Sequence, residues 1–270
     1  MRRALTAGIV AALLATSFPA SGSPPRGSQA PPVAAECSRT WVGHEAEFEQ
    51  ALRDGKIAKM GNVPIGVTKP QRATLDPPTP VARFAWKPLP PGYKNGFMES
   101  YKAEIAAYEL DKLLDLHMVP PVVARQVDGL NGAAVCWIEH TKSWDKDHPP
   151  NGREPEWSYQ ISRMKMFDLF IANIDRNQGN LIYDSDWHLF LIDHSRCFTG
   201  KKDLKNIAPL GRVDRALWTR MSALTFDDLQ KALGAWVADG DLRAMLVRRD
   251  QMAAAIQKLV ADRGDASVFF

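Results

Sequence analysis

The sequence predicts an α+β protein with two lobes, in which a β-rich N-terminal lobe precedes a mainly helical C-terminal lobe and a cleft lies between them. Short β-prone runs bounded by Gly and Pro dominate residues 60–139, and one helical run lies among them. Helical spacing of apolar residues dominates residues 157–262. A hairpin pattern over residues 173–195 interrupts these helices, so we expect the hairpin to form part of the cleft.

The N-terminus has the pattern of a secretory signal peptide. Met1, Arg2 and Arg3 form a basic start, an uncharged apolar run extends to Phe18, and small residues follow it. We therefore expect export, to a periplasmic or extracellular location. The expected domains are a signal peptide over 1–22, a flexible Pro/Ser/Gly-rich tether over 23–36 and a folded domain over 37–266, with an N-lobe of about 37–140 and a C-lobe of about 141–266.

Composition limits the partners that the chain is expected to have. The formal net charge is +3, and it falls close to zero when Arg2 and Arg3 leave with the signal peptide, so nothing indicates nucleic acid. No later apolar run could cross a membrane, and we expect a monomer whose mature chain has no membrane span. Cys37, Cys136 and Cys197 allow at most one disulfide, and the sequence does not choose the pair.

The secondary-structure elements follow in order from these patterns. We expect a helix over 41–56, a hairpin within 60–75, a strand over 81–87 and a loop over 88–96. A helix over 97–116, strands over 119–123 and 132–139 around a turn at 128–132, and a crossing loop over 140–157 come next. Helices are expected over 157–174, from Thr225, and over 241–262, the last with a solvated basic side formed by Arg243, Arg248, Arg249 and Lys258.

The turn within the first hairpin has residues that suit phosphate binding. Gly66, Thr68 and Lys69 lie in the stretch Gly-Val-Thr-Lys-Pro, which can offer backbone N–H groups and an ammonium to a phosphate. An ordinary hairpin turn is the alternative interpretation, because the stretch has no distinctive spacing.

A lysine and a glutamate from separate elements form a candidate ion pair. Lys87 ends the strand over 81–87, and Glu104 borders the apolar stripe of the helix over 97–116. A carboxylate at that border is well placed to pair with a lysine on a neighbouring strand. The alternative is a glutamate that faces solvent.

The stretch from Asn173 to Ser195 predicts a β-hairpin in which two short apolar runs flank the turn residues Asp184-Ser185-Asp186. Since a hairpin brings its open ends together, Asp175 and Asn180 at the entry are expected near Asp193 at the exit. Two carboxylates and an amide oxygen are hard ligands of the kind that Mg²⁺ takes together with nucleotide phosphates.

These parts together match the requirements of phosphoryl transfer. That chemistry needs a turn over the phosphates, a lysine on them, a carboxylate that holds the lysine, metal ligands, and a carboxylate near the attacking hydroxyl. The sequence supplies them in the order in which a kinase does.

Two motifs carry a resemblance to a known group, Asp175-Arg-Asn-Gln-Gly-Asn180 and Ile192-Asp-His-Ser195. They resemble the Asp-Arg-His-x-x-Asn and Ile-Asp-His/Phe/Asn-Gly motifs of the atypical protein-kinase-like superfamily. That superfamily includes the phosphoinositide 3-/4-kinase-type core, the HipA-like bacterial kinases and the secretory-pathway Fam20/four-jointed kinases. The resemblance covers about residues 63–198. The stretches Gly66–Pro70, Phe84–Lys87, Glu104–Tyr108 and Val119–Pro121 also resemble exported bacterial members of this group. It implies a bilobal protein-kinase-like fold with an active-site hairpin.

The resemblance also implies roles and cofactors. Asp175 and Asn177 are the expected catalytic positions, with Asp175 as the catalytic base or hydroxyl-orienting group. The other expected roles are metal ligands (Asn180 and Asp193), a lysine on the phosphates (Lys87), the carboxylate that holds it (Glu104) and a hinge beside adenine (Cys136–Glu139). The implied cofactors are ATP and Mg²⁺, with Mn²⁺ as a substitute. The implied function is phosphotransfer to an alcohol group, and the sequence leaves open whether the acceptor is a protein, a sugar or a small molecule.

Two positions depart from the family pattern and keep a second function open. Asn177 replaces a histidine that is linked to chemistry in the phosphoinositide branch, and Ser195 replaces a glycine. The alternative function is a secreted pseudokinase, a nucleotide- or partner-binding module that transfers nothing. A hydrolase triad of Asp193, His194 and Ser195 is disfavoured, because consecutive residues of a strand point to opposite faces.

Overall fold

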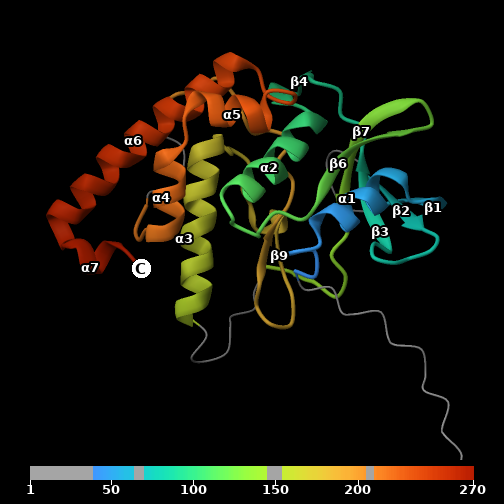
Figure 1. Ribbon diagram of the computed structural model, residues 1–270, viewed down its shortest axis with the longest axis horizontal. Coiled ribbons are helices and arrows are strands. Elements are labelled where there is room, and N and C mark those ends of the chain that lie inside the picture. The colour runs from blue at the N-terminus through green and yellow to red at the C-terminus, as the bar shows by residue number, and fades with distance from the viewer. Residues whose placement is uncertain (1–38, 64–69, 145–153, 205–209) are drawn as a thin grey trace, which may run out of the picture. The chain divides into compact units, whose positions relative to one another are not determined.

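The N-terminal part of the chain folds around a five-stranded antiparallel sheet, as the computed structural model shows (Figure 1). The structure describes residues 39–63, 70–144, 154–204 and 210–270. The predictions for residues 1–36, for Cys37 and for Gly66, Thr68 and Lys69 lie outside the described residues. The strands are β1 (Ile57–Asn62), β2 (Gln71–Leu75), β3 (Arg83–Lys87), β6 (Val122–Val127) and β7 (Leu130–Cys136), in the spatial order β1-β2-β3-β7-β6.

Two helices pack against opposite faces of this sheet. Helix α1 (Glu45–Asp54) contributes Phe48 and Leu52 to one buried cluster, and helix α2 (Tyr101–Leu113) contributes Ile105 to the other. Successive residues of β7 alternate between the two clusters, because side chains alternate across a strand. The two predicted helices are therefore confirmed, with α2 beginning at Tyr101 rather than at the predicted residue 97.

Alternation along β3 determines where Lys87 points. Phe84 and Trp86 pack on the α1 side of the sheet, so Lys87 faces the α2 side. Gly132 of β7 allows the close approach at this strand end, because a Cβ there would lie 2.7 Å from the Lys87 carbonyl oxygen and 2.6 Å from the Trp86 ring. The sheet therefore determines both the position of Lys87 at the end of β3 and the face to which its side chain points.

A short hairpin precedes helix α2 where a loop was predicted. Strand β4 (Gly92–Lys94) pairs with β5 (Phe97–Glu99), so the expectations of a loop over 88–96 and of a helix from Phe97 are wrong. Three-residue strands in a stretch rich in Pro and Gly give no periodic signal. Ser100 then starts the helix, because its hydroxyl accepts the Lys102 backbone N–H at 3.0 Å.

The turn between β6 and β7 is tighter than the predicted 128–132. Asp128 and Gly129 form it, and both have positive φ, 50° and 78°. An Asp-Gly pair in this conformation matches the right-handed twist of the strands. The strand β7 therefore starts at Leu130 and includes Gly132.

The C-terminal part is mainly helical, as predicted. Its helices are α3 (Glu154–Ile171), α4 (Arg215–Ala223), α5 (Phe226–Leu233), α6 (Asp239–Arg263) and α7 (Asp265–Val268). Helix α3 runs beside α6 (Figure 1), and it begins and ends earlier than the predicted 157–174. The predicted start of α5 is confirmed, since Thr225 and Asp228 form a capping box.

The predicted hairpin is present and belongs to a small three-stranded sheet. Strand β9 (Leu181–Tyr183) pairs antiparallel with β10 (Leu189–Leu191), and a one-turn 3₁₀ helix, η1 (Gln178–Asn180), leads into β9. The third strand, β8 (Lys142–Ser143), pairs with β9 and lies within the predicted crossing loop.

The basic side of helix α6 is not wholly solvated, so that prediction is wrong for Arg248. Its side chain is 0 % exposed and donates to the carbonyl oxygens of Phe170 and Thr199 at 2.9 and 3.2 Å. Burial lowers the pKa of Arg248 to about 10. The arginine thus joins α6 to the end of α3, and a charge pattern alone does not distinguish this role from exposure.

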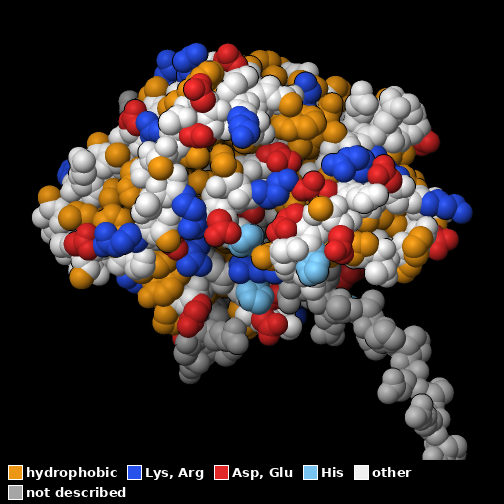
Figure 2. Space-filling view, in the orientation of Figure 1, with side chains coloured by type: hydrophobic (Ala, Val, Ile, Leu, Met, Phe, Trp, Pro, Cys, Tyr) orange, Lys and Arg blue, Asp and Glu red, His pale blue; other side chains and the backbone are white. Residues whose placement is uncertain are grey.

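The surface carries charges of both signs. On the face shown in Figure 2, Lys and Arg side chains are interspersed with Asp and Glu side chains. Within the described part of the chain, no helix has both the length and the apolar character that crossing a membrane requires.

Candidate active site

A lysine from the sheet, a glutamate from α2 and an aspartate after β10 meet in one buried cluster. Lys87 Nζ donates to Glu104 Oε1 at 2.6 Å and to Asp193 Oδ1 at 3.0 Å. Glu104 is 1 % exposed, and its other oxygen accepts the His194 backbone N–H at 3.1 Å. The predicted Lys87–Glu104 pair is therefore present, and the alternative of a solvent-facing Glu104 does not hold.

The cluster is electrostatically asymmetric. Burial disfavours the charge on Lys87, but Glu104 and Asp193 outweigh it and raise the pKa of the ammonium. Burial raises the pKa of Glu104 against the opposing charge of Lys87. Burial acts in the same direction on Asp193, yet the Lys87 charge and hydrogen bond lower the pKa of that carboxyl below its ordinary value. At neutral pH the site thus holds a fixed cation beside an ionised aspartate.

Arg176 joins the open end of the hairpin to helix α3. Its Nε and Nη2 atoms donate to the two oxygens of the buried Asp168 carboxylate, each at 2.9 Å. Its Nη1 atom donates to the carbonyl oxygens of Asn180 and Ile192 at 3.1 and 2.9 Å. Arg176 had no predicted role. Asp168 is a lone acid in an apolar helix, and a buried acid requires a partner, so Asp168 could have indicated a partner such as Arg176.

His194 lies between the two ion clusters and is neutral. Arg176 Nη2 donates to His194 Nε2 at 2.9 Å, and because a guanidinium can only donate, this ring nitrogen carries no proton. Burial, together with the Arg176 and Lys87 charges, lowers the pKa of His194 well below its ordinary value. With Asp193 at φ 64° after the end of β10, the Asp-His-Ser stretch does not continue the strand.

Asp175, Asn180 and Asp193 each keep one side-chain oxygen available. Asp175 Oδ2 accepts Arg196 Nη1 at 3.0 Å, and Asn180 Nδ2 donates to the Asp175 carbonyl oxygen at 3.0 Å. Asp193 uses Oδ1 for Lys87 and for the Ser195 hydroxyl, which donates at 3.3 Å. Asp175 Oδ1, Asn180 Oδ1 and Asp193 Oδ2 have no hydrogen-bond partner among the residues that the structure describes. Such oxygens are the donor type that Mg²⁺ and Mn²⁺ take.

Asn177 holds the turn that leads into η1. Its Oδ1 accepts the Gly179 backbone N–H at 2.9 Å, and its Nδ2 donates to the Asp175 carbonyl oxygen at 3.1 Å. Both polar groups of this side chain thus form local hydrogen bonds, at the position where the motif that the sequence resembles has a histidine.

Arg196 and Glu99 also belong to the site, and sequence reasoning missed both. Arg196 donates to Glu99 Oε1 through Nε and Nη2, at 2.9 and 2.6 Å, and to Asp175 through Nη1. Its guanidinium also lies over the Phe97 ring, 4.4 Å from the centroid. One side chain therefore connects strand β5 to the predicted catalytic base. Glu99 could not be related to Arg196 from the sequence, because strand β5, which carries Glu99, was predicted as part of a helix.

Glu139 lies apart from this group. Its carboxylate pairs with Arg83, which begins β3, whereas Lys87 ends that strand. The structure therefore does not bring the Glu139 side chain to the Lys87 cluster. Among the cysteines, Cys136 is buried in β7, and Cys197 is a free thiol whose pKa burial raises well above its ordinary value.

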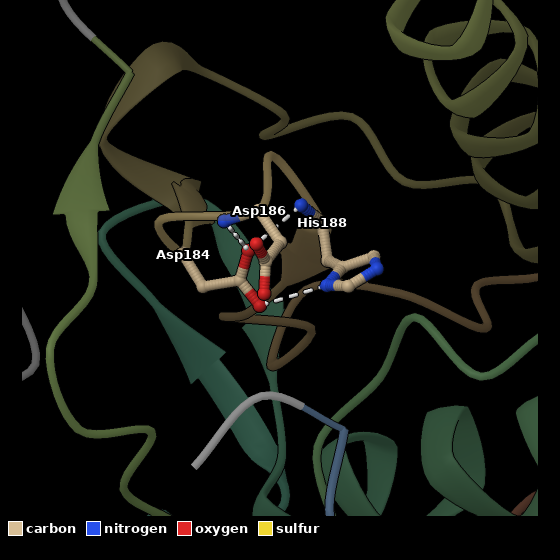
Figure 3. A group of neighbouring side chains, drawn as sticks. All are labelled: Asp184, Asp186 and His188. Carbon is tan, nitrogen blue, oxygen red and sulfur yellow. Dashed lines mark hydrogen bonds and ion pairs between the residues drawn. The ribbon is translucent and has the colours of Figure 1, made fainter. Parts of the chain in front are cut away.

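A second group of possible metal ligands lies at the β9–β10 turn. Ligand atoms of Asp184, Asp186 and His188 fall within 4.8 Å of one another (Figure 3). Asp184 Oδ1 accepts the backbone N–H groups of Asp186 and His188, and Oδ2 contacts His188 Nδ1, each at 2.9 Å. These bonds form the turn that Asp184-Ser185-Asp186 predicted, and they account for the positions of Asp184 and His188 without an ion.

The fold resembles solved kinase structures, whereas sequence comparison gives no relatives. No protein-family profile matches the sequence. No curated protein sequence matches it either. A structure of hydra Fam20 with sugar is similar at a TM-score of 0.65 and 16 % identity, covering 84 % of this chain and 92 % of that one. A structure of the Golgi casein kinase with Mn/ADP bound gives 0.63 and 13 %, covering 84 % and 79 %. At these identities the likeness concerns the fold, which is α+β and kinase-like.

Proposed function

We propose that this protein is a phosphotransferase that uses ATP with a divalent metal and transfers a phosphoryl group to an alcohol. The observation that carries the proposal is the buried cluster in which Lys87 contacts Glu104 at 2.6 Å and Asp193 at 3.0 Å. These residues come from β3, α2 and the segment after β10, and kinase chemistry requires this combination of a held lysine and a metal-binding aspartate. The Mn/ADP complex of a structural neighbour supports the choice of ligands.

The residues divide the work as follows. Lys87, held in place by Glu104, supplies a fixed positive charge for the nucleotide phosphates. Asn180 and Asp193 would hold the metal, Mg²⁺ or Mn²⁺, through the oxygens left without partners. When bound, the metal neutralises charge on the phosphates.

Asp175 is the proposed base. Arg196 holds its Oδ2 atom, and Oδ1 is left to accept the proton of the acceptor hydroxyl. The acceptor oxygen forms a bond to the γ-phosphorus, the bond from that phosphorus to the bridging oxygen breaks, and ADP leaves. The side chain of Asp175 is 39 % exposed, so an acceptor can reach it.

A pseudokinase is the second candidate, and Asn177 favours it. The histidine that is linked to chemistry in the phosphoinositide branch is absent. Both polar groups of the Asn177 side chain form hydrogen bonds within its own turn. Such a chain would bind the nucleotide through Lys87 and Asp193 and transfer nothing. The leader predicted over residues 1–22 adds export to either proposal. N-terminal sequencing of the protein tests the predicted cleavage, and a retained leader would contradict that prediction.

The test is to measure ADP formation from ATP and Mg²⁺ by the wild type and by Asp175→Asn, with nucleotide binding measured in parallel. Slow transfer to water or to the protein itself serves as the readout, since the acceptor is unidentified. We expect a rate that falls roughly 10²- to 10⁴-fold in the variant, with binding retained. Binding without ADP formation in the wild type would establish the pseudokinase, and absence of binding would exclude both functions.

A further inference from the structure

A cavity of about 890 Å³ lies next to Arg196, which contacts the proposed base, and its wall does not include Lys87, Glu104 or Asp193. Its wall includes Ile174, Ser195 and Arg196, and Arg196 touches Asp175 at 3.0 Å. Lys87, Asn180 and Asp193 are not part of that wall. Asp175 is not among the wall residues either, and its link to the cavity is Arg196, which belongs to the wall and donates to Asp175 Oδ2.

Three segments enclose the cavity, and much of what they present is apolar. The β4–β5 hairpin contributes Tyr93, Phe97 and Met98, whose side chains are 85 %, 41 % and 39 % exposed. The segment after the β9–β10 hairpin contributes Phe198, and the chain between α5 and α6 contributes Trp236. Strand β4 and helices α2 and α5 lie near one another in Figure 1. The presence of Tyr93, Phe97, Phe198 and Trp236 in one wall favours an aromatic ligand.

The charges in the wall are mainly positive. Lys102 and Lys201 have no ion-pair partner within the described ranges, while Arg196 is paired with Glu99 and Asp175. The acid in the wall is Asp241, and burial raises its pKa, which disfavours its charged form. An anionic group on the ligand would complement this wall.

One buried polar atom of the cavity wall lacks a partner. Thr199 Oγ1 belongs to the wall and has no hydrogen-bond partner among the described residues. A buried hydroxyl without a partner is costly, and a polar group on the ligand would supply that partner.

We propose that this cavity is the acceptor site and that it takes a small aromatic alcohol bearing an anionic group. The assignment as an acceptor site rests on the proposed function, because it takes Asp175 as the base. The size fits a small molecule, since such sites commonly measure roughly 300 to 1,000 Å³. The aromatic side chains would hold the ring and Lys102 or Lys201 the anion, with the reacting hydroxyl directed past Arg196 toward Asp175.

Binding to the full chain tests the proposal without nucleotide or turnover. The probes are 3-phenyllactate and 3-phenylpropane-1,2-diol, which differ in that a carboxylate replaces a hydroxymethyl group, and a serine-containing peptide is the third ligand. We expect 3-phenyllactate to bind roughly tenfold more tightly than the diol. Tyr93→Ala and Lys102→Gln should each weaken it about fivefold. Matched controls are Leu130→Ala and Lys258→Gln, which alter exposed residues outside the cavity and should change nothing.

Several results would overturn the proposal. Equal affinity for the two probes would show that the cavity does not recognise the anionic group. No binding of either probe at millimolar concentration would show that the cavity is not a site for such a ligand. Binding of the peptide with none of 3-phenyllactate would assign the cavity to a protein acceptor instead. A separate titration with ATP and Mg²⁺ reports on the proposed function, so its failure is distinguishable from failure of the cavity assignment.

Discussion

The β9–β10 hairpin has two polar ends, and they differ in where their partners come from. At the turn, Asp184 is satisfied by residues at most four positions away (Figure 3). At the open end, Asp193 binds Lys87 across 106 positions of sequence. Local partners explain why the turn folds. Partners gathered from distant elements into a buried cluster are instead the basis for the ligand site that we propose at the open end.

The largest effect should come from breaking the structural cluster that holds the open end. Arg176→Met leaves the Asp168 carboxylate buried and unpaired, so we expect the free energy of unfolding to fall by roughly 3 to 5 kcal/mol. Urea unfolding at pH 7 measures this fall in the free energy of unfolding. The control is Arg215→Met, whose ion pair with Asp265 is exposed and should cost at most about 1 kcal/mol. Equal losses would show that the Arg176 cluster does not hold the hairpin.

The second effect concerns the base rather than the fold. Arg196→Ala frees Oδ2 of Asp175, and a misplaced base should lower turnover about 10²-fold while nucleotide affinity stays unchanged. Arg196→Lys should recover part of the loss, because an ammonium keeps one charged contact. Initial rates and nucleotide titrations check this. Parallel loss of rate and affinity would mean that Arg196 supports the whole cleft and not Asp175 in particular.

The third effect is a pH dependence at the open end, where Arg176, Lys87 and Glu104 face His194. His194 stays neutral in the folded protein, whereas the unfolded chain takes up a proton below its ordinary pKa of 6.5. Below that value the unfolded state binds more protons than the folded state. The contribution of His194 therefore lowers the free energy of unfolding by up to about 1.4 kcal/mol for each unit by which the pH falls. His194→Gln should lose stability less steeply between about pH 6.5 and 5. Identical slopes for the two proteins would contradict this.

The smallest effect should come from the turn. Asp184→Ala removes the acceptor of two backbone N–H groups, and we expect a loss of about 1 kcal/mol in the free energy of unfolding. Nucleotide binding should remain at the wild-type level, because none of the proposed ligand contacts lies at this end. A loss of metal-dependent binding in this variant would assign a ligand role to the turn.

The sequence predicted the features that depend on local pattern. Turn residues between two apolar runs defined the hairpin, and a capping box defined the start of α5. The Lys87–Glu104 pair was also predicted, because a strand end and a helix border can be identified from periodicity.

The features that were missed depend on long-range packing. Arg196 and Glu99 meet only because β4 and β5 form a hairpin, and strands of three residues leave no periodic signal. Arg248 has the spacing of an exposed residue, yet carbonyl groups at the end of α3 bury it. Such partners are fixed by the tertiary fold, so spacing along the chain does not identify them.

Thermal stabilisation by ATP, with and without Mg²⁺, tests the central claim most directly. We predict that ATP with Mg²⁺ raises the Tm of the wild type, with about 2.7 kcal/mol of stabilisation at a hundredfold excess over Kd. Asp193→Ala should lose the metal-dependent part, while Asp186→Ala, at the turn, should keep it. No metal-dependent shift in the wild type, or an equal shift in Asp193→Ala, would contradict the assignment of the open end as a nucleotide and metal site.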